Sequence, residues 1–374
     1  MKARLGNYIS EYSVRNHAGE NIPVYSVTNT DGFCTGYFDK DVSSKDKSTY
    51  KIVPKGFFAY NPSRINVGSI DWLRYRDRVI VSPLYVVFSV SDRLLPQYLY
   101  YYLKSNVGLN YICATSQGSV RNNLKFSMLQ DFPIEIRTIE EQKVVISILD
   151  KIKNLCLLQK KILEQYDNLI KARFVEMFGD LRVNPFGFKK KKLKDTCIVI
   201  TGNTPSRSVP EYYGDYMEWI KTDNIVTGFL NPTKSVEYLS EAGVNVGRTV
   251  EKDSILMACI AGSVASIGRV CITDRKVAFN QQINAVIPKE YDVLFLYVML
   301  QMSKDYLTEE INMALKGILS KSKLEEKEFI IPPIKQQKQF ATFVTQVDKS
   351  KVAVQKSLEQ TQMLFDSLMQ QYFG

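Results

Sequence analysis

The sequence contains little of the chemistry that catalytic and metal sites use. Among 374 residues there is one histidine, His17, and the six cysteines are scattered with no C-x-x-C pair. These absences exclude the usual zinc spacings and argue against a disulfide framework. No cysteine or serine forms a persuasive pattern with His17, so nucleophilic catalysis is not indicated either.

Long apolar runs are also missing. No stretch reaches the roughly 18 uninterrupted apolar residues of a membrane span, and residues 255–268 are apolar but short and broken by Ser and Gly. The opening "MKARLGNYIS" has no apolar run after its charges, so no signal peptide is predicted. We therefore expect a cytoplasmic protein with no membrane partner.

Two further enzymatic motifs are incomplete. An adenine methyltransferase needs an Asn/Asp-Pro-Pro-aromatic loop, and residues 61–63, 184–186 and 231–233 contain Asn-Pro without matching it. Gly262 and Gly268 are one residue too far apart for a phosphate-binding loop, and no Lys-Ser/Thr follows them. The sequence therefore predicts a non-catalytic protein, with no catalytic residue, metal ligand or cofactor.

What the sequence does contain is positive charge and an internal repeat. The net charge of +10 favours a polyanionic partner, because Lys and Arg at phosphates release condensed counterions, although solubility alone is the simpler explanation. The pentapeptide "IEEQK" at 139–143 returns as "IKQQK" at 334–338, a step of 195 residues. The match continues without a gap from 139–179 to 334–374.

Both copies of the repeat have the heptad pattern of a coiled coil. Eight of ten positions at alternating spacings of four and three are apolar in each copy. In the first copy the positions are Val145, Leu149, Ile152, Cys156, Gln159, Leu163, Tyr166, Ile170, Arg173 and Met177. In the second they are Phe340, Val344, Val347, Lys351, Val354, Leu358, Thr361, Phe365, Leu368 and Tyr372.

The ends of these helices are marked in the sequence. Thr138 to Glu141 forms a capping box, Pro332-Pro333 precedes the second copy, and Gly179 occupies the position of a C-terminal glycine. Each helix is expected to be about 58 Å long. The two are expected to pair as an antiparallel coiled coil; the alternative is that each packs separately on a domain surface.

Each helix follows a region rich in strand-forming residues. Residues 22–28, 50–60 and 78–90 are predicted strands, and a helix is predicted from Pro96; the region before the second helix repeats this order more loosely. We therefore predict an α/β (α+β) fold with mainly antiparallel strands. The expected domains are residues 1–137 and 180–333, alternating with helices at 138–179 and 334–374.

The order of these motifs resembles the specificity (S) subunit of type I restriction-modification systems. The matching segments are "TGNTPS" (201–206), "WIKTDNI" (219–225), "AGSVASIGRV" (261–270), "FNQQINAVIP" (279–288) and "IPPIKQQ" (331–337). The first domain matches through "YNPSRINVGSI" (60–70) and "SPLYVVF" (82–88). Arg137-Thr138 replaces the Pro-Pro entry in the first copy, where the capping box keeps a helix start plausible.

The resemblance implies two target-recognition domains, each reading one half of an interrupted double-stranded DNA sequence, with the helices setting the spacing. It also implies two modification (methyltransferase) subunits carrying the S-adenosylmethionine chemistry, and restriction subunits that hydrolyse ATP, so this chain should bind neither cofactor. The alternative hypothesis is a non-catalytic coiled-coil adaptor whose basic surface is incidental.

Polar residues in the matching segments are the candidate DNA contacts, because base edges are read by side chains while lysines mostly contact phosphates. In the first domain the candidates are Thr28, Asn29, Arg64, Asn66, Arg121, Asn122 and Asn123. In the second they are Lys189, Lys190, Thr204, Lys221, Asn224, Ser263, Arg269, Lys321 and Lys323. For each residue, an ordinary solvated or turn-forming role is the alternative. Gln281 and Gln282 are expected to pack rather than to read bases.

Overall fold

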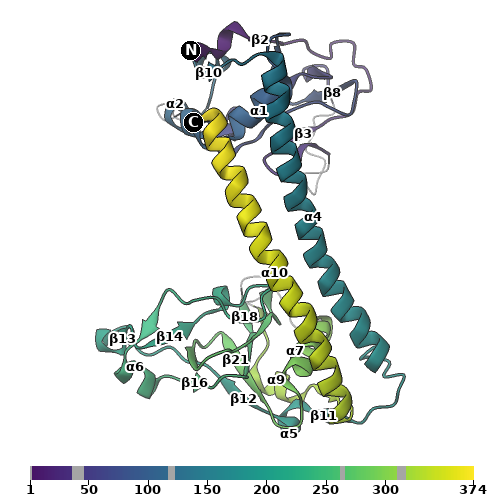
Figure 1. The fold of residues 1–374 in the computed structure, drawn as a ribbon, viewed down its shortest axis with the longest axis vertical. Coiled ribbons are helices and arrows are strands. Elements are labelled where there is room, and N and C mark those ends of the chain that lie inside the picture. The colour runs from purple at the N-terminus through teal and green to yellow at the C-terminus, as the bar shows by residue number, and fades with distance from the viewer. Residues whose placement is uncertain (1, 36–45, 117–122, 262–265, 310–316) are drawn as a thin grey trace. The chain divides into compact units, whose positions relative to one another are not determined.

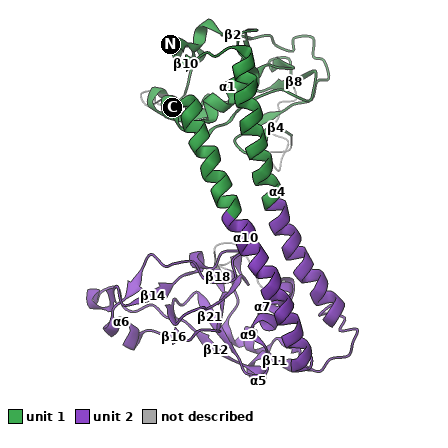
Figure 2. Cartoon of the chain, in the orientation of Figure 1, with its two compact units in different colours: residues 1–159, 357–374 green, residues 160–356 purple. Residues whose placement is uncertain are grey.

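The computed structural model describes residues 2–35, 46–116, 123–261, 266–309 and 317–374. The chain forms two compact units (Figure 2). Unit 1 consists of Met1–Gln159 and Ser357–Gly374, and unit 2 consists of Lys160–Lys356. Two 40-residue helices, α4 (Ile139–Phe178) and α10 (Ile334–Phe373), contribute to both units (Figure 1).

Unit 1 is a mixed α/β unit in which the strands pair antiparallel. Its strands are β1 (Lys2–Arg4), β2 (Ile9–Glu11), β3 (Ser26–Thr28), β4 (Gly32–Cys34), β5 (Lys51–Pro54), β6 (Phe58–Tyr60), β7 (Ile70–Trp72), β8 (Arg78–Val81), β9 (Val86–Val90) and β10 (Pro133–Glu135). The central sheet has the order β2-β9-β6-β7, with the pairs β1-β10, β3-β4 and β5-β8 beside it. The helices are α1 (Pro96–Lys104), α2 (Asn106–Ser116) and α3 (Phe126–Gln130), with short 3-10 turns η1 (Leu5–Asn7) and η2 (Ile65–Val67).

Unit 2 is also a mixed α/β unit, but it contains a five-stranded sheet in addition to a four-stranded one. Its strands are β11 (Lys190–Lys192), β12 (Cys197–Thr201), β13 (Tyr213–Gly214), β14 (Met217–Ile220), β15 (Tyr238–Leu239), β16 (Thr249–Val250), β17 (Ile255–Ala258), β18 (Ile260–Ala261), β19 (Val270–Ile272), β20 (Val277–Phe279), β21 (Ile283–Pro288), β22 (Gly317–Ile318) and β23 (Glu328–Ile330). The sheets have the orders β12-β21-β17-β19 and β13-β15-β14-β20-β16, and β11-β23 and β18-β22 form two separate two-stranded sheets. All described pairs are antiparallel except β14-β20. The helices are α5 (Leu193–Thr196), α6 (Glu241–Val246), α7 (Val293–Met302), α8 (Lys304–Thr308) and α9 (Lys321–Glu326), with 3-10 turns η3 (Pro210–Tyr212) and η4 (Thr222–Asn224).

Each unit contains the beginning of one long helix and the end of the other. In unit 1, Val145 and Leu149 of α4 share a core with Met369 and Phe373 of α10. In unit 2, Phe340 of α10 shares a core with the end of α4, including Phe174 and Phe178. Because start meets end in both units, the helices pair antiparallel, and none of the twenty predicted heptad positions is exposed. The predicted fold class is confirmed.

Polar residues interrupt this apolar seam at specific places. In unit 1, Gln159 Nε2 donates to Ser357 Oγ at 2.8 Å and to Thr361 Oγ1 at 3.2 Å. In unit 2, Lys351 Nζ lies 2.6 Å from Asp167 Oδ1. In each pair one partner, Gln159 or Lys351, is mostly covered by the seam, so a slip of the helices would leave that group without its partner and the pairs favour a single register.

The glutamine of the repeated pentapeptide has the same role in both units. It joins the long helix by hydrogen bonds to the start of a domain helix, α1 in unit 1 and α7 in unit 2. Gln142 is fully buried; its Oε1 accepts from Leu95 N at 2.8 Å, and its Nε2 donates to the carbonyls of Arg93 and Arg137, both at 2.9 Å. Leu95 is the N-cap of α1, so the bond also satisfies a helix-terminal amide.

The second copy repeats this arrangement. Gln337 is equally buried, and its Oε1 accepts from the backbone amide of Asp292, the N-cap of α7, at 2.9 Å. Its Nε2 donates to Pro332 O at 2.8 Å, the equivalent of the Arg137 contact. Conservation of "QK" between the two copies is therefore explained by a buried hydrogen-bonding role of the glutamine.

Candidate nucleic-acid interface

In unit 1, three segments that carry candidate residues lie together. Lys104, the last residue of α1, donates from Nζ to Asn29 Oδ1 at 2.9 Å and also to the carbonyl of Gly68, which ends η2. The third segment joins through Leu124 N, which donates to Pro62 O at 3.2 Å. Lys104 thus holds the loop after β3 against η2, beside residues 123–124.

The candidates in this group differ in exposure. Asn29 and Arg64 are exposed, and Asn66 and Asn123 are half-buried. Thr28 is buried, and its Oγ1 accepts from the backbone amide of Asp31 at 3.1 Å, so it shapes the turn. The predictions for Arg121 and Asn122 fall outside the described residues.

Lys104 itself was not predicted from the sequence. Burial lowers its pKa to about 8, a shift that the Asp71 carboxylate opposes and Lys153 reinforces. Nearby, Arg74 binds the Asp71 carboxylate at 2.8 and 3.1 Å and lies 3.4 Å above the Trp72 ring. No local motif marks this group, because its members meet only through the β7–α1 packing.

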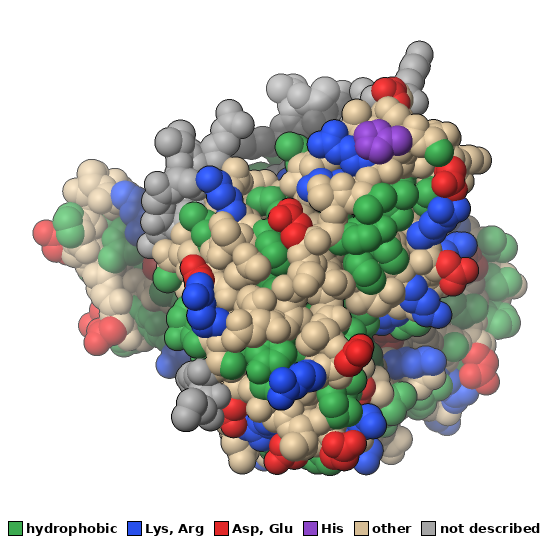
Figure 3. All heavy atoms as spheres, turned by 90° about the horizontal axis from the view of Figure 1, so that it is seen from above, with side chains coloured by type: hydrophobic (Ala, Val, Ile, Leu, Met, Phe, Trp, Pro, Cys, Tyr) green, Lys and Arg blue, Asp and Glu red, His purple; other side chains and the backbone are tan. Residues whose placement is uncertain are grey.

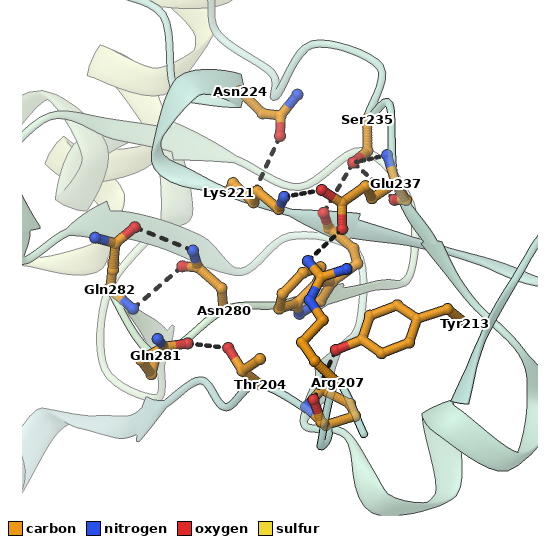
Figure 4. Close-up of polar contacts among 12 residues, drawn as sticks. Thr204, Arg207, Tyr213, Lys221, Asn224, Ser235, Glu237, Asn280, Gln281 and Gln282 are labelled. Carbon is orange, nitrogen blue, oxygen red and sulfur yellow. Dashed lines mark hydrogen bonds and ion pairs between the residues drawn. The ribbon is translucent and has the colours of Figure 1, made fainter. Parts of the chain in front are cut away.

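In unit 2, Thr204, Lys221 and Asn224 lie where the two paired strands β14 and β20 end (Figure 4). Asn224 Oδ1 accepts from Lys221 N at 3.0 Å, which closes η4, and its Nδ2 donates to Lys234 O at 3.1 Å. Thr204 Oγ1 donates to Gln281 Oε1, and Arg269 reaches the carbonyl of Thr222 at 3.4 Å. The structure therefore brings four predicted residues to one site.

The remaining lysines lie elsewhere in unit 2. Lys190 is exposed on β11, which lies beside α10, on the other side of the unit from β14 (Figure 1). Its neighbours are paired with acids: Lys191 with Glu290 at 2.7 Å, and Lys192 with Glu326 at 2.7 Å. Lys189, Lys321 and Lys323 are exposed, and none of the described contacts joins them to Thr204 or Asn224. Ser263 lies outside the described residues.

Gln282 behaves as a structural residue, whereas Gln281 is exposed and bonds Thr204. The carbonyl of Gln282 accepts from Cys259 N at 2.8 Å, and its side chain bonds Asn280 Nδ2 at 3.2 Å. On the face drawn in Figure 3, Lys and Arg side chains are interspersed with Asp and Glu. The face drawn there therefore shows no patch of a single sign of charge.

Sequence analysis missed the group around Arg207. Its guanidinium carbon lies 4.3 Å from the Tyr213 ring centroid and 5.2 Å from that of Trp219, and Glu237 Oε2 accepts from Nη2 at 2.5 Å. Lys221 Nζ binds the other oxygen of Glu237. The available signal was Arg207 directly after the "TGNTPS" segment, but its partners are distant in sequence.

Burial raises the pKa of the Cys259 and Cys271 thiols to about 12, so both are protonated at neutral pH. Within residues 2–35, 46–116, 123–261, 266–309 and 317–374, no three His, Cys, Asp or Glu side chains are placed to share a metal ion. No described helix has the length and apolar character of a membrane span.

The fold and these loop sites define a class of protein. Its members have two tandem mixed α/β domains, each followed by a long helix, and their loops carry amide, guanidinium and ammonium groups. The Methylase_S family, described as the type I restriction modification DNA specificity domain, matches residues 6–167 and 185–361. The chain therefore belongs to the Methylase_S family. The alternative hypothesis, a coiled-coil adaptor with an incidental basic surface, is therefore not favoured.

Two curated relatives are similar over part of their length. The chain is 35% identical over 120 residues to the Type I restriction enzyme HindI specificity subunit of Haemophilus influenzae, covering 31% of this chain and 25% of that one. It is 26% identical over 190 residues to the Type I restriction enzyme MjaIX specificity subunit of Methanocaldococcus jannaschii, covering 48% and 43%. The matches thus span less than half of either relative.

Solved structures share the fold along the whole chain. One, from work on complex assembly and conformational transition of the type I R-M system, has a TM-score of 0.60 at 18% identity, covering 100% of this chain and 97% of that one. The type I restriction-modification S subunit from M. genitalium has a TM-score of 0.56 at 15% identity, covering 100% and 96%. At these identities the likeness establishes the fold.

Proposed function

We propose that this chain is the DNA-specificity subunit of a type I restriction-modification complex and reads a two-part double-stranded target. One observation carries the proposal: the family domain matches twice, and each match includes a mixed α/β region and most of a long helix. Each unit also holds its own cluster of candidate contact residues, around Asn29 in unit 1 and around Lys221 in unit 2. Two separate reading sites in one chain suit a target with two specified halves.

The proposed division of the chain follows the repeat. Residues 1–137 and 180–333 act as target-recognition domains, and residues 138–179 and 334–374 act as helical spacers that set the distance between the half-sites. The support is that α4 and α10 each continue for 40 residues and keep their heptad positions covered. A helix of this length extends about 60 Å, enough to span a helical turn of DNA.

The proposed contacts divide by chemistry. Amides and guanidinium groups such as those of the exposed Asn29 and Arg64 and the half-buried Arg269 suit base edges, because they present two hydrogen-bonding groups in a plane. Exposed ammonium groups such as those of Lys189 and Lys190 suit phosphates. The other proposed contacts are Asn66, Arg121, Asn122, Asn123, Thr204, Lys221, Asn224, Ser263, Lys321 and Lys323, with Thr28 shaping its loop.

The chain is proposed to be non-catalytic and to act through partners. The names of its relatives describe specificity subunits of type I restriction enzymes. Two modification subunits would then supply methyl transfer from S-adenosylmethionine, and restriction subunits would supply ATP-driven cleavage. The protonated buried thiols and the single histidine support this assignment, because they leave the described chain poor in nucleophiles.

The decisive experiment is methylome sequencing of cells that express the chain with its modification subunits. We expect one interrupted methylated motif, and replacing residues 1–137 with another recognition domain should change one half of it. A chimera that alters both halves would contradict the one-domain-one-half assignment. In vitro, the logarithm of affinity should fall with the logarithm of salt concentration by about 0.9 per phosphate contact, whereas an adaptor would show no such response.

A further inference from the structure

Two aromatic rings and an acidic side chain hold Arg207 in a single orientation. Its guanidinium lies over Tyr213 and Trp219, and among the described residues Glu237 is the one acceptor that it binds. The Arg207 side chain is nevertheless 56% exposed. A guanidinium has five N–H donors, so donors remain at its exposed edge.

The two aromatic rings beneath Arg207 are themselves held in place by hydrogen bonds. Trp219 is 3% exposed, and its indole Nε1 donates to Asn203 O at 3.3 Å, while Tyr213 Oη donates to Pro205 O at 2.6 Å. Both rings therefore fasten the loop that carries Arg207 to the sheet. The backbone of Glu237 is fixed as well, because its carbonyl accepts from Trp219 N at 3.0 Å.

Glu237 pairs with two cations at once. Lys221 binds one carboxylate oxygen and lies 5.0 Å from the Trp219 ring centroid, while Arg207 binds the other oxygen (Figure 4). The hydrogen bond from Lys221, with that from Arg207, holds the pKa of Glu237 below its usual range. The carboxylate is therefore ionised at neutral pH and reduces the attraction of both cations for phosphate.

Resting on the proposed function, we propose that Arg207 reads a guanine in the half-site of unit 2 and that Glu237 is its positioning residue. A guanidinium fork matches the O6 and N7 acceptors of guanine, and an arginine that is already oriented loses less conformational freedom on binding. An acid beside it disfavours the competing phosphate contact, which carries no sequence information. Arg207, Glu237 and Lys221 form the Arg207 clamp.

The test uses the full chain with its modification subunits, and compares Arg207→Lys, Glu237→Gln and the control Arg275→Lys. Arg275 lies in the loop before β20 of the same sheet and also binds a glutamate, Glu218. Arg207→Lys keeps the charge but loses the two-pronged fork. We expect one guanine position of the unit 2 half-site to become degenerate in the methylome, with roughly 5- to 150-fold lost discrimination against the other bases.

Glu237→Gln releases both cations, so we expect tighter binding to unrelated DNA and a salt slope steeper by up to about 1.8, two phosphate contacts. Loss of folding alone would not steepen this slope. An unchanged motif with uniformly weaker binding of Arg207→Lys to all DNA would overturn the inference in favour of a phosphate contact. A wild-type complex with no methylated motif would instead overturn the proposed function itself.

Discussion

The buried glutamine of each repeat copy should control the stability of its own unit and no other. Replacing Gln142 by leucine keeps the volume but removes three hydrogen bonds, those with Leu95 N, Arg93 O and Arg137 O. At about 1 kcal/mol for each bond, the free energy of unfolding of unit 1 should fall by about 3 kcal/mol. Gln337→Leu removes two such bonds, so unit 2 should lose about 2 kcal/mol.

The two tryptophans allow the units to be followed separately. Trp72 lies in unit 1 and Trp219 in unit 2, and both are buried. In variants that keep one tryptophan, denaturant unfolding measured by fluorescence reports on one unit. Gln142→Leu should shift the Trp72 transition, with a Tm about 6–12 °C lower for a unit of this size, and leave the Trp219 transition unchanged.

Matched controls come from the next repeat position. Lys143 and Lys338 are exposed and one residue beyond the glutamines, so Lys143→Leu and Lys338→Leu should change stability by less than about 0.5 kcal/mol. A Gln142→Leu variant that loses less than about 1 kcal/mol would refute the reasoning. Equal shifts of both tryptophan transitions would refute the independence of the two units.

Three further predictions concern charge and length. Lys104 has a pKa of about 8 in the folded chain against 10.5 when free, so the unfolded chain binds more protons between these two pH values. Unit 1 should therefore gain stability as the pH rises from 8 toward 10, and Lys104→Met should remove that gain in denaturant titrations. An equal slope of stability against pH in both proteins would contradict this prediction. Lys351→Met should leave the free energy of unfolding of unit 2 unchanged within about 1 kcal/mol or raise it. Asp167→Ala should lower it by about 1–2 kcal/mol, because it removes the partner of a mostly buried ammonium. The opposite ranking of the two variants in unfolding experiments would contradict this. Inserting seven residues into one of the two long helices adds about 10.5 Å, about three base-pair steps of 3.4 Å, and the mismatch with the unlengthened helix absorbs part of it. The unread gap of the methylated motif should therefore grow by one to three base pairs with both half-sequences kept, and an active variant with an unchanged gap would show that the helices do not set the spacing.

The long helices could be predicted from sequence because their signals are local and repeated. The heptad positions are covered in the fold, and the predicted capping box forms, with Thr138 N donating to Glu141 Oε2 at 2.8 Å. Gly179 ends α4 with a positive φ of 75°, the left-handed conformation that favours glycine. Strand-rich regions were also identified, since alternating β-branched and aromatic residues are a short-range pattern.

The contacts at the candidate interface could not be predicted, because they join residues far apart in sequence. Lys221 was a candidate, but its acid Glu237 and the neighbouring Arg207 come from two other loops. Lys104 reaches Asn29 from the end of a helix 75 residues away. The parallel pairing of β14 with β20 was likewise invisible, since it depends on a long crossover and not on local pattern.

The discontinuous composition of unit 1 has a consequence for synthesis on the ribosome. Its last segment, Ser357–Gly374, carries Phe373, whose ring lies 5.1 Å from Tyr98 and 6.3 Å from Tyr102 on α1. At about 5–20 residues per second, the intervening part of about 200 residues takes roughly 10–40 s to emerge. During that interval Tyr98 and Tyr102 of the domain made first lack the cover of Phe373, and an apolar surface of this kind is a binding target for chaperones. Unit 2 is complete once Lys356 has been made, before unit 1 is. Removing the final 18 residues should therefore damage the N-terminal domain and spare the one next to the cut.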